Sequence, residues 1–91
     1  MTIHEKVKEL RPQLAVYRDE AKTKKQKWSL ELLHDALVFT AEARVQAMPP
    51  QALAEFVELM AVAKMQDEPD PRWVRQSLLR LGFQVAPQGL N

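Results

Sequence analysis

The sequence predicts an all-α fold, a compact bundle of about four helices in a single domain spanning residues 1–91. Three observations indicate this fold class. Apolar residues recur at spacings of three and four, which places them on one face of a helix. Prolines and helix-capping residues separate the periodic segments. No stretch of useful length alternates apolar and polar residues as a β-strand does.

The first predicted helix, residues 3–27, carries an apolar seam. Its members lie alternately four and three residues apart, which is typical of helices that pack nearly parallel or antiparallel. They are Ile3, Val7, Leu10, Leu14, Tyr17 and Ala21. Pro12 interrupts the segment, and a proline inside a helix removes a hydrogen bond at a cost of ~3 kcal/mol. Because the seam continues in register, we expect either a kink or a break near Pro12.

The second and third predicted helices, residues 30–48 and 50–66, are unusually apolar. Ser29 is the expected N-cap of the second, since its hydroxyl can accept a hydrogen bond from an N–H of the first turn. Pro49 and Pro50 end this helix and start the next, because proline is tolerated at the first helical position. Apolar residues surround most of the second helix, so we expect it to be buried on most sides.

The fourth predicted helix, residues 71–81, has a signal at each end. Asp70 suits the N-cap and Pro71 the first helical position. Gly82 is the expected left-handed residue that ends the helix. A short C-terminal tail follows.

The composition narrows the classes of function. The chain has 13 Lys and Arg, 12 Asp and Glu, two Gly and no Cys. Without Cys there is no disulfide framework, thiol catalysis or Cys-ligated metal. Two glycines leave no material for a phosphate-binding loop. Glu31 and His34 have the spacing of a metal-ligand pair, but the sequence has no second copy of this motif, so we expect no metal. From the composition as a whole we expect no cofactor and no enzyme activity.

No signal peptide or membrane-spanning segment is predicted. The longest apolar stretches contain charged residues and fall short of the ~20 residues that a spanning helix needs. We therefore expect a cytoplasmic protein without a membrane partner.

The preferred functional interpretation is a small non-enzymatic protein-interaction module, acting as a regulator, inhibitor or adaptor. Helices 30–48 and 50–66 have more apolar surface than two remaining short helices would cover, and dimerisation is a usual way for a small chain to complete its core. The expected partners are a second copy of the chain and a protein target. The candidate interaction residues are Phe56, Leu59, Met60, Val62 and Met65.

Two groups of basic residues support an alternative, a nucleic-acid-binding regulator. Lysine and arginine side chains bind phosphates through counterion release and bidentate contacts. The first group is Lys22, Lys24, Lys25 and Lys27, and the second is Arg72, Arg75 and Arg80 of the fourth helix. The competing interpretation of the lysines is a solvated turn that ends the first helix, where cations suit the helix dipole.

Overall fold

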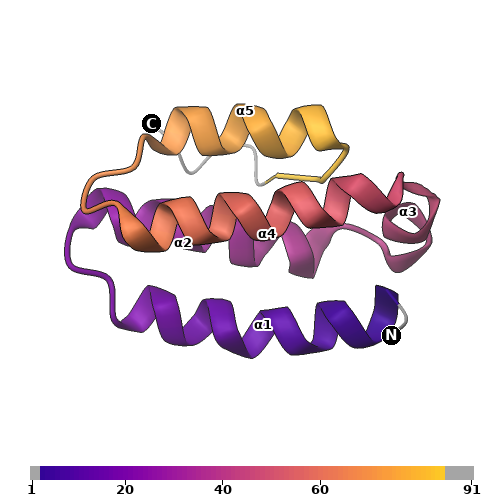
Figure 1. The fold of residues 1–91 in the computed structure, drawn as a ribbon, viewed down its shortest axis with the longest axis horizontal. Coiled ribbons are helices and arrows are strands. Elements are labelled where there is room, and N and C mark those ends of the chain that lie inside the picture. The colour runs from indigo at the N-terminus through magenta and orange to yellow at the C-terminus, as the bar shows by residue number, and fades with distance from the viewer. Residues whose placement is uncertain (1–2, 86–91) are drawn as a thin grey trace.

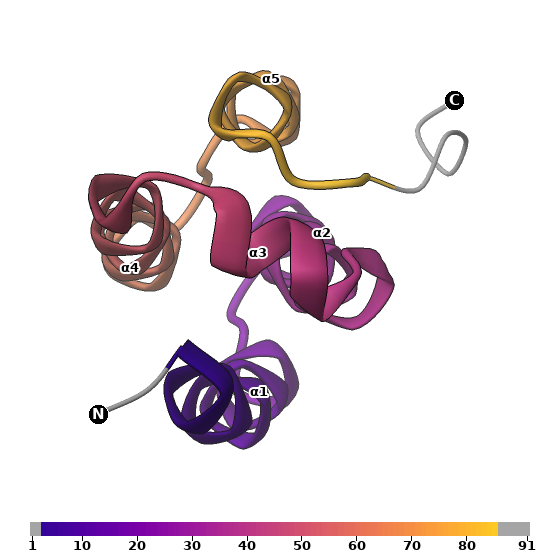
Figure 2. The same cartoon turned by 90° about the vertical axis from the view of Figure 1, so that its right-hand side faces the viewer.

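The computed structural model describes residues 3–85, which form α-helices and no β-strand, so the all-α prediction is confirmed. The helices are α1 (Ile3–Asp19), α2 (Lys24–Phe39), α3 (Glu42–Ala47), α4 (Pro50–Met65) and α5 (Pro71–Leu81). α2 packs against α1, α4 and α5 and therefore lies at the centre of the bundle. Figures 1 and 2 show α1 and α5 on opposite sides of a layer made by α2 and α4.

The core is built from the apolar side of each long helix. Leucines supply most of it, and they come from α1, α2, α4 and α5. The largest fully buried apolar side chains are Leu10, Leu14, Leu30, Leu33, Leu37, Phe56, Val74 and Leu78. Burial of each such side chain contributes about 1.5–3 kcal/mol to folding. From its predicted seam, α1 contributes the buried Leu10 and Leu14, with Val7 and Tyr17 partly buried beside them.

The first helix passes through Pro12 without a break, so of the two expected outcomes the structure excludes a separate short helix. Pro12 lies on the exposed side of α1. The carbonyl that loses its N–H partner there, that of Lys8, therefore lies on the side of the helix where water can hydrate it.

The boundary between the first two helices was predicted wrongly. α1 ends at Asp19 rather than near residue 27, and α2 begins at Lys24. Thr23 is the N-cap of α2, because its Oγ1 accepts a hydrogen bond from the backbone N–H of Gln26 at 3.1 Å. Ser29, the expected cap, is fully buried in the middle of α2. The sequence did hold the signal, since Thr23 and Gln26 have the spacing of a capping box.

The predicted helix 30–48 is divided in two. α2 ends at Phe39, residues 40 and 41 are extended, and the short α3 follows. Thr40 is buried at this break, and its Oγ1 accepts a hydrogen bond from the backbone N–H of Gln84 at 2.8 Å. The end of α2 therefore coincides with a hydrogen bond between two residues that are 44 positions apart in the sequence.

The last two helices agree with their predicted bounds. Pro50 and Pro71 both lie in the first turn of their helices. The side chain of Asp70 caps α5 by accepting from the N–H of Arg72 at 3.0 Å. Gly82 has a φ of 102° and ends α5 in the left-handed conformation. The N–H of Phe83 then bonds to the carbonyl of Leu78 at 3.0 Å, which completes a helix-ending motif.

Candidate protein-docking site

The residues expected to form a docking face on α4 divide between the core and the surface. Phe56, Leu59 and Met60 are buried within the monomer, so they belong to the core and do not form an exposed face. Val62 is half-buried and Met65 is 82% exposed. The helix period explains this division, because the first three lie on the side of α4 that faces the bundle interior.

Within the part of the chain that the structure describes, most large apolar side chains are buried or half-buried in the monomer. α2 is covered by three helices, and α4 buries one full side. The large apolar side chains that remain exposed are distributed over several helices: Val16, Val38, Phe39, Met65, Trp73 and Leu79. Surplus area therefore does not require a second chain, and a docking surface has to be recognised by its shape and charge.

A groove of about 270 Å³ lies between α4 and α5. These two helices are antiparallel neighbours in Figure 1, and both pack mainly on α2 rather than on each other. Apolar side chains line much of the groove: Leu59 and Val62 from α4, Trp73 and Leu81 from α5. Three charged side chains complete the lining: Glu55 and Glu58 from α4, Arg80 from α5.

The helix period places these side chains on facing flanks. Val74 and Leu78 are buried and fix the orientation of α5 on the bundle. Trp73 and Arg80 are seven residues apart, two helical turns, so they share the flank of α5 that borders the groove. Trp73 is 47% exposed, which leaves part of its ring available for contact with another molecule.

On α4, the groove-lining residues Glu55, Glu58 and Val62 follow one another at spacings of three and four, so they also share one flank. Met65 lies one turn beyond Val62 and extends this flank toward the end of the helix. Among the residues that the structure describes, neither carboxylate has an ion-pair partner, and neither does Arg80. The groove therefore has unpaired negative charge on its α4 side and unpaired positive charge on its α5 side.

Sequence reasoning did not select four of the residues that line this groove: Glu55, Glu58, Leu81 and, chief among them, Trp73. The sequence did indicate Trp73, because it lies seven residues before Arg80 on a helix whose buried side contains Val74 and Leu78. Leu59, Val62 and Arg80 were selected, but as members of different candidate sites. The structure brings these residues of α4 and α5 into one groove.

The lysine-rich turn lies at one end of the bundle, where α1 passes into α2 (Figure 1). Lys22, Lys24, Lys25 and Lys27 are all exposed. The last three belong to the first turns of α2 instead of ending α1. Their charges thus lie at the positive end of the α2 dipole, which corrects the expectation that they favour a helix C-terminus.

Acidic residues lie at the same end of the bundle as these lysines. The hydroxyl of Thr23 donates a hydrogen bond to the backbone carbonyl of Asp67 and so joins the lysine-rich turn to the loop that precedes α5. That loop contains Asp67, Glu68 and Asp70, all exposed. The carboxylates reduce the positive potential that the lysines alone would produce.

The three arginines of α5 do not share one exposed surface with the lysines. Arg72 lies in the first turn of α5, at the lysine end of the bundle, and is exposed. Arg75 is half-buried. Arg80 lies about 12 Å further along the helix, in the groove beside α4. The composite basic surface that would favour nucleic acid is therefore divided.

Within residues 3–85, no group of three or more His, Asp or Glu side chains is arranged to hold a metal ion. Over that same range, no helix is both long and apolar enough to cross a membrane. No protein-family model matches the chain, and no curated protein or solved structure is significantly similar to it.

Proposed function

We propose that this chain is a small non-enzymatic protein-interaction module that pairs with a second copy of itself through the α4–α5 groove. The observation that carries the proposal is the distribution of charge around an apolar groove, acidic on α4 and basic on α5. An apolar groove rimmed by charge is typical of a surface that binds a protein.

This distribution is complementary to itself. A two-fold axis running along the groove places α4 of one copy over α5 of the other. Glu55 and Glu58 then face Arg80 of the second copy, and Val62 faces its Trp73. Each contact occurs twice, so both copies use the same residues.

The two kinds of contact have different roles in such a dimer. Tryptophan is enriched among the residues that dominate binding energy, and Trp73 would be the apolar anchor. The charges would set the orientation of the two chains, because a wrongly oriented pair places like charges together. Met65, one turn beyond Val62, would enlarge the apolar contact.

Light scattering tests the proposal on the full chain at two micromolar concentrations that differ tenfold. We expect a mass twice the 10.5 kDa of one chain. Arg80→Glu places a carboxylate opposite Glu55 and Glu58 of the second copy, so this variant should be monomeric. The double variant Glu55→Arg with Glu58→Arg should be monomeric for the same reason.

A mixture of these two variants separates a specific interface from a general loss of association. Mixed in equal amounts, the chains should form a heterodimer, because each reversed charge again meets its opposite. Arg44→Glu changes an exposed helical arginine outside the groove and should leave the dimer unchanged. A wild-type chain that scatters as a 10.5 kDa monomer at both concentrations would refute the proposal, as would a mixture that stays monomeric.

A further inference from the structure

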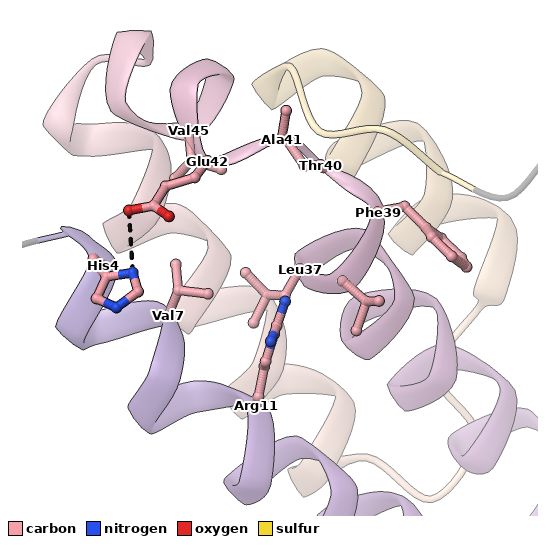
Figure 3. Close-up of a pocket in the computed structure, with 10 residues that line it drawn as sticks. His4, Val7, Arg11, Leu37, Phe39, Thr40, Ala41, Glu42 and Val45 are labelled. Atoms are coloured by element: carbon pink, nitrogen blue, oxygen red, sulfur yellow. Dashed lines mark ion pairs between the residues drawn. The ribbon is translucent and has the colours of Figure 1, made fainter.

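A second cleft, of about 290 Å³, opens where α1, the end of α2 and α3 meet (Figure 3). It lies at the opposite end of the bundle from the lysine-rich turn. Aliphatic side chains from all three helices line it: Val7, Leu37, Val38 and Val45. The titratable side chains at the cleft are His4, Arg11 and Glu42. The cleft thus combines aliphatic and polar side chains in comparable amounts, and polar groups in a small-molecule site fix the orientation of the ligand.

The carboxylate of Glu42 already has partners within the protein. Its Oε1 lies 3.1 Å from Nδ1 of His4 and accepts a hydrogen bond from Nε2 of Gln46 at 3.3 Å. Figure 3 shows the contact between His4 and Glu42 at the edge of the cleft. Glu42 is therefore occupied by donors and is not directed at a ligand cation.

Arg11 is the charged group of the cleft without an ion-pair partner among residues 3–85. It lies four residues after Val7, on the same side of α1. In Figure 3 its side chain extends from α1 toward Leu37 of α2, while the ring of Phe39 points away. An exposed guanidinium group thus lies beside the aliphatic side chains of the cleft.

We propose that this cleft binds a small carboxylate with a short branched aliphatic tail. The carboxylate would form a bidentate ion pair with Arg11, for which a guanidinium has the matching geometry. The tail would pack against Val7, Leu37 and Val45. The volume is close to the lower limit of the range for small-molecule sites, so it limits the ligand to a small acid.

NMR titration of the isotope-labelled full chain tests this site, with 4-methylpentanoate as the probe. We expect the largest amide shifts at Val7, Leu37 and Val45. The uncharged analogue 4-methylpentanamide has the same tail and should bind about two- to fivefold more weakly, because Arg11 is exposed and water screens its ion pair with the acid. Arg11→Gln should weaken binding of the acid by a similar factor while its spectrum remains that of a folded protein.

Arg44→Gln is the matched control, since Arg44 is an exposed arginine of α3 that does not line the cleft. It should bind the acid as the wild type does. Equal binding of the acid and the amide would overturn the proposal, as would unchanged binding by Arg11→Gln. Shifts spread evenly over the protein, or none at all, would also overturn it. The α4–α5 groove takes no part in this site, so the result is independent of the proposed dimer.

Discussion

The side-chain amide of Gln26 donates a hydrogen bond to the backbone carbonyl of Lys64 at 2.8 Å, across 38 residues of sequence. The same nitrogen lies 3.2 Å from the carbonyl oxygen of Ala63 and 3.0 Å from that of Gln66. Its Oε1 accepts from the backbone N–H of Lys22 at 2.6 Å. The last carbonyls of a helix have no N–H partner within it. One buried glutamine therefore satisfies the end of α4 and fixes the α1–α2 turn against it.

Gln26→Glu should lower the free energy of unfolding by about 2–3 kcal/mol, since it replaces the donor by an acceptor that faces several carbonyl oxygens and leaves them unpaired. Gln26 is only 4% exposed, so water does not readily replace the lost donor. Urea denaturation followed by circular dichroism measures the change. Gln13→Glu, at an exposed position of α1, is the control and should cost less than about 0.5 kcal/mol. Equal losses in the two variants would contradict this role of Gln26.

Alanine substitutions at the two candidate N-caps of α2, Thr23 and Ser29, should have opposite effects on the free energy of unfolding. Thr23→Ala removes the hydroxyl that caps the helix and should cost about 1 kcal/mol. Ser29→Ala replaces a buried hydroxyl without a hydrogen-bond partner by a methyl group, at a helical position where alanine is preferred. Its free energy of unfolding should stay the same or rise. If Ser29→Ala were the more destabilising variant, the cap would be at Ser29 after all.

Phe56 and Met65 both belonged to the predicted docking face, yet their removal should have very different effects. The ring of Phe56 is fully buried and its centroid lies 5.0 Å from that of Phe83. Phe56→Ala should cost about 3–5 kcal/mol. Met65→Ala should change the free energy of unfolding by less than about 0.5 kcal/mol under conditions where the chain is monomeric. Thermal or chemical denaturation of a dilute sample distinguishes a core position from a surface position.

Charge reversal at the start of α2 should stabilise the protein. Lys24→Glu replaces a cation by an anion at the positive end of the helix dipole, which is expected to gain about 0.3–1 kcal/mol at low ionic strength. The gain should shrink at high salt, because Lys24 is exposed and its interactions are screened. Denaturation at two salt concentrations measures both effects. A salt-sensitive loss of stability would instead mean that Lys24 contacts acidic groups.

Local chemistry was sufficient to predict much of the fold. Asp70, Pro71 and Gly82 act on residues within one turn of themselves, and the bounds of α5 follow from them. The apolar period of α1 similarly identified Leu10 and Leu14 as core residues. The caps act locally, and the apolar period of α1 marks the side that packs on its neighbours, so both could be recognised in short stretches of sequence.

Features that depend on distant contacts were not predictable in this way. The break after Phe39 has neither glycine nor proline, and Thr40 there is bonded to Gln84, far along the chain. The lysine-rich turn resembled the end of the first helix. The start of α2 is instead fixed by the Thr23 cap and by the hydrogen bond of Gln26 to α4.

The candidate groove was predictable only in part. Val62 could be selected because its helix has many apolar residues, and Arg80 because it is one of several basic residues on α5. Their shared groove depends on how α4 and α5 rest on α2, which no short stretch of sequence encodes.

The central position of α2 has a consequence for the order in which the protein opens. A hydrogen bond from Gln26 to Lys64 joins the start of α2 to the end of α4. A second hydrogen bond joins Thr40, just beyond the end of α2, to Gln84. α2 also packs against three other helices, so unwinding it disrupts the three largest helix–helix interfaces at once. Its amide hydrogens should therefore exchange with solvent only when the whole molecule unfolds. α1 packs chiefly on α2, and its amides should exchange through smaller, more frequent openings that leave the remaining helices intact.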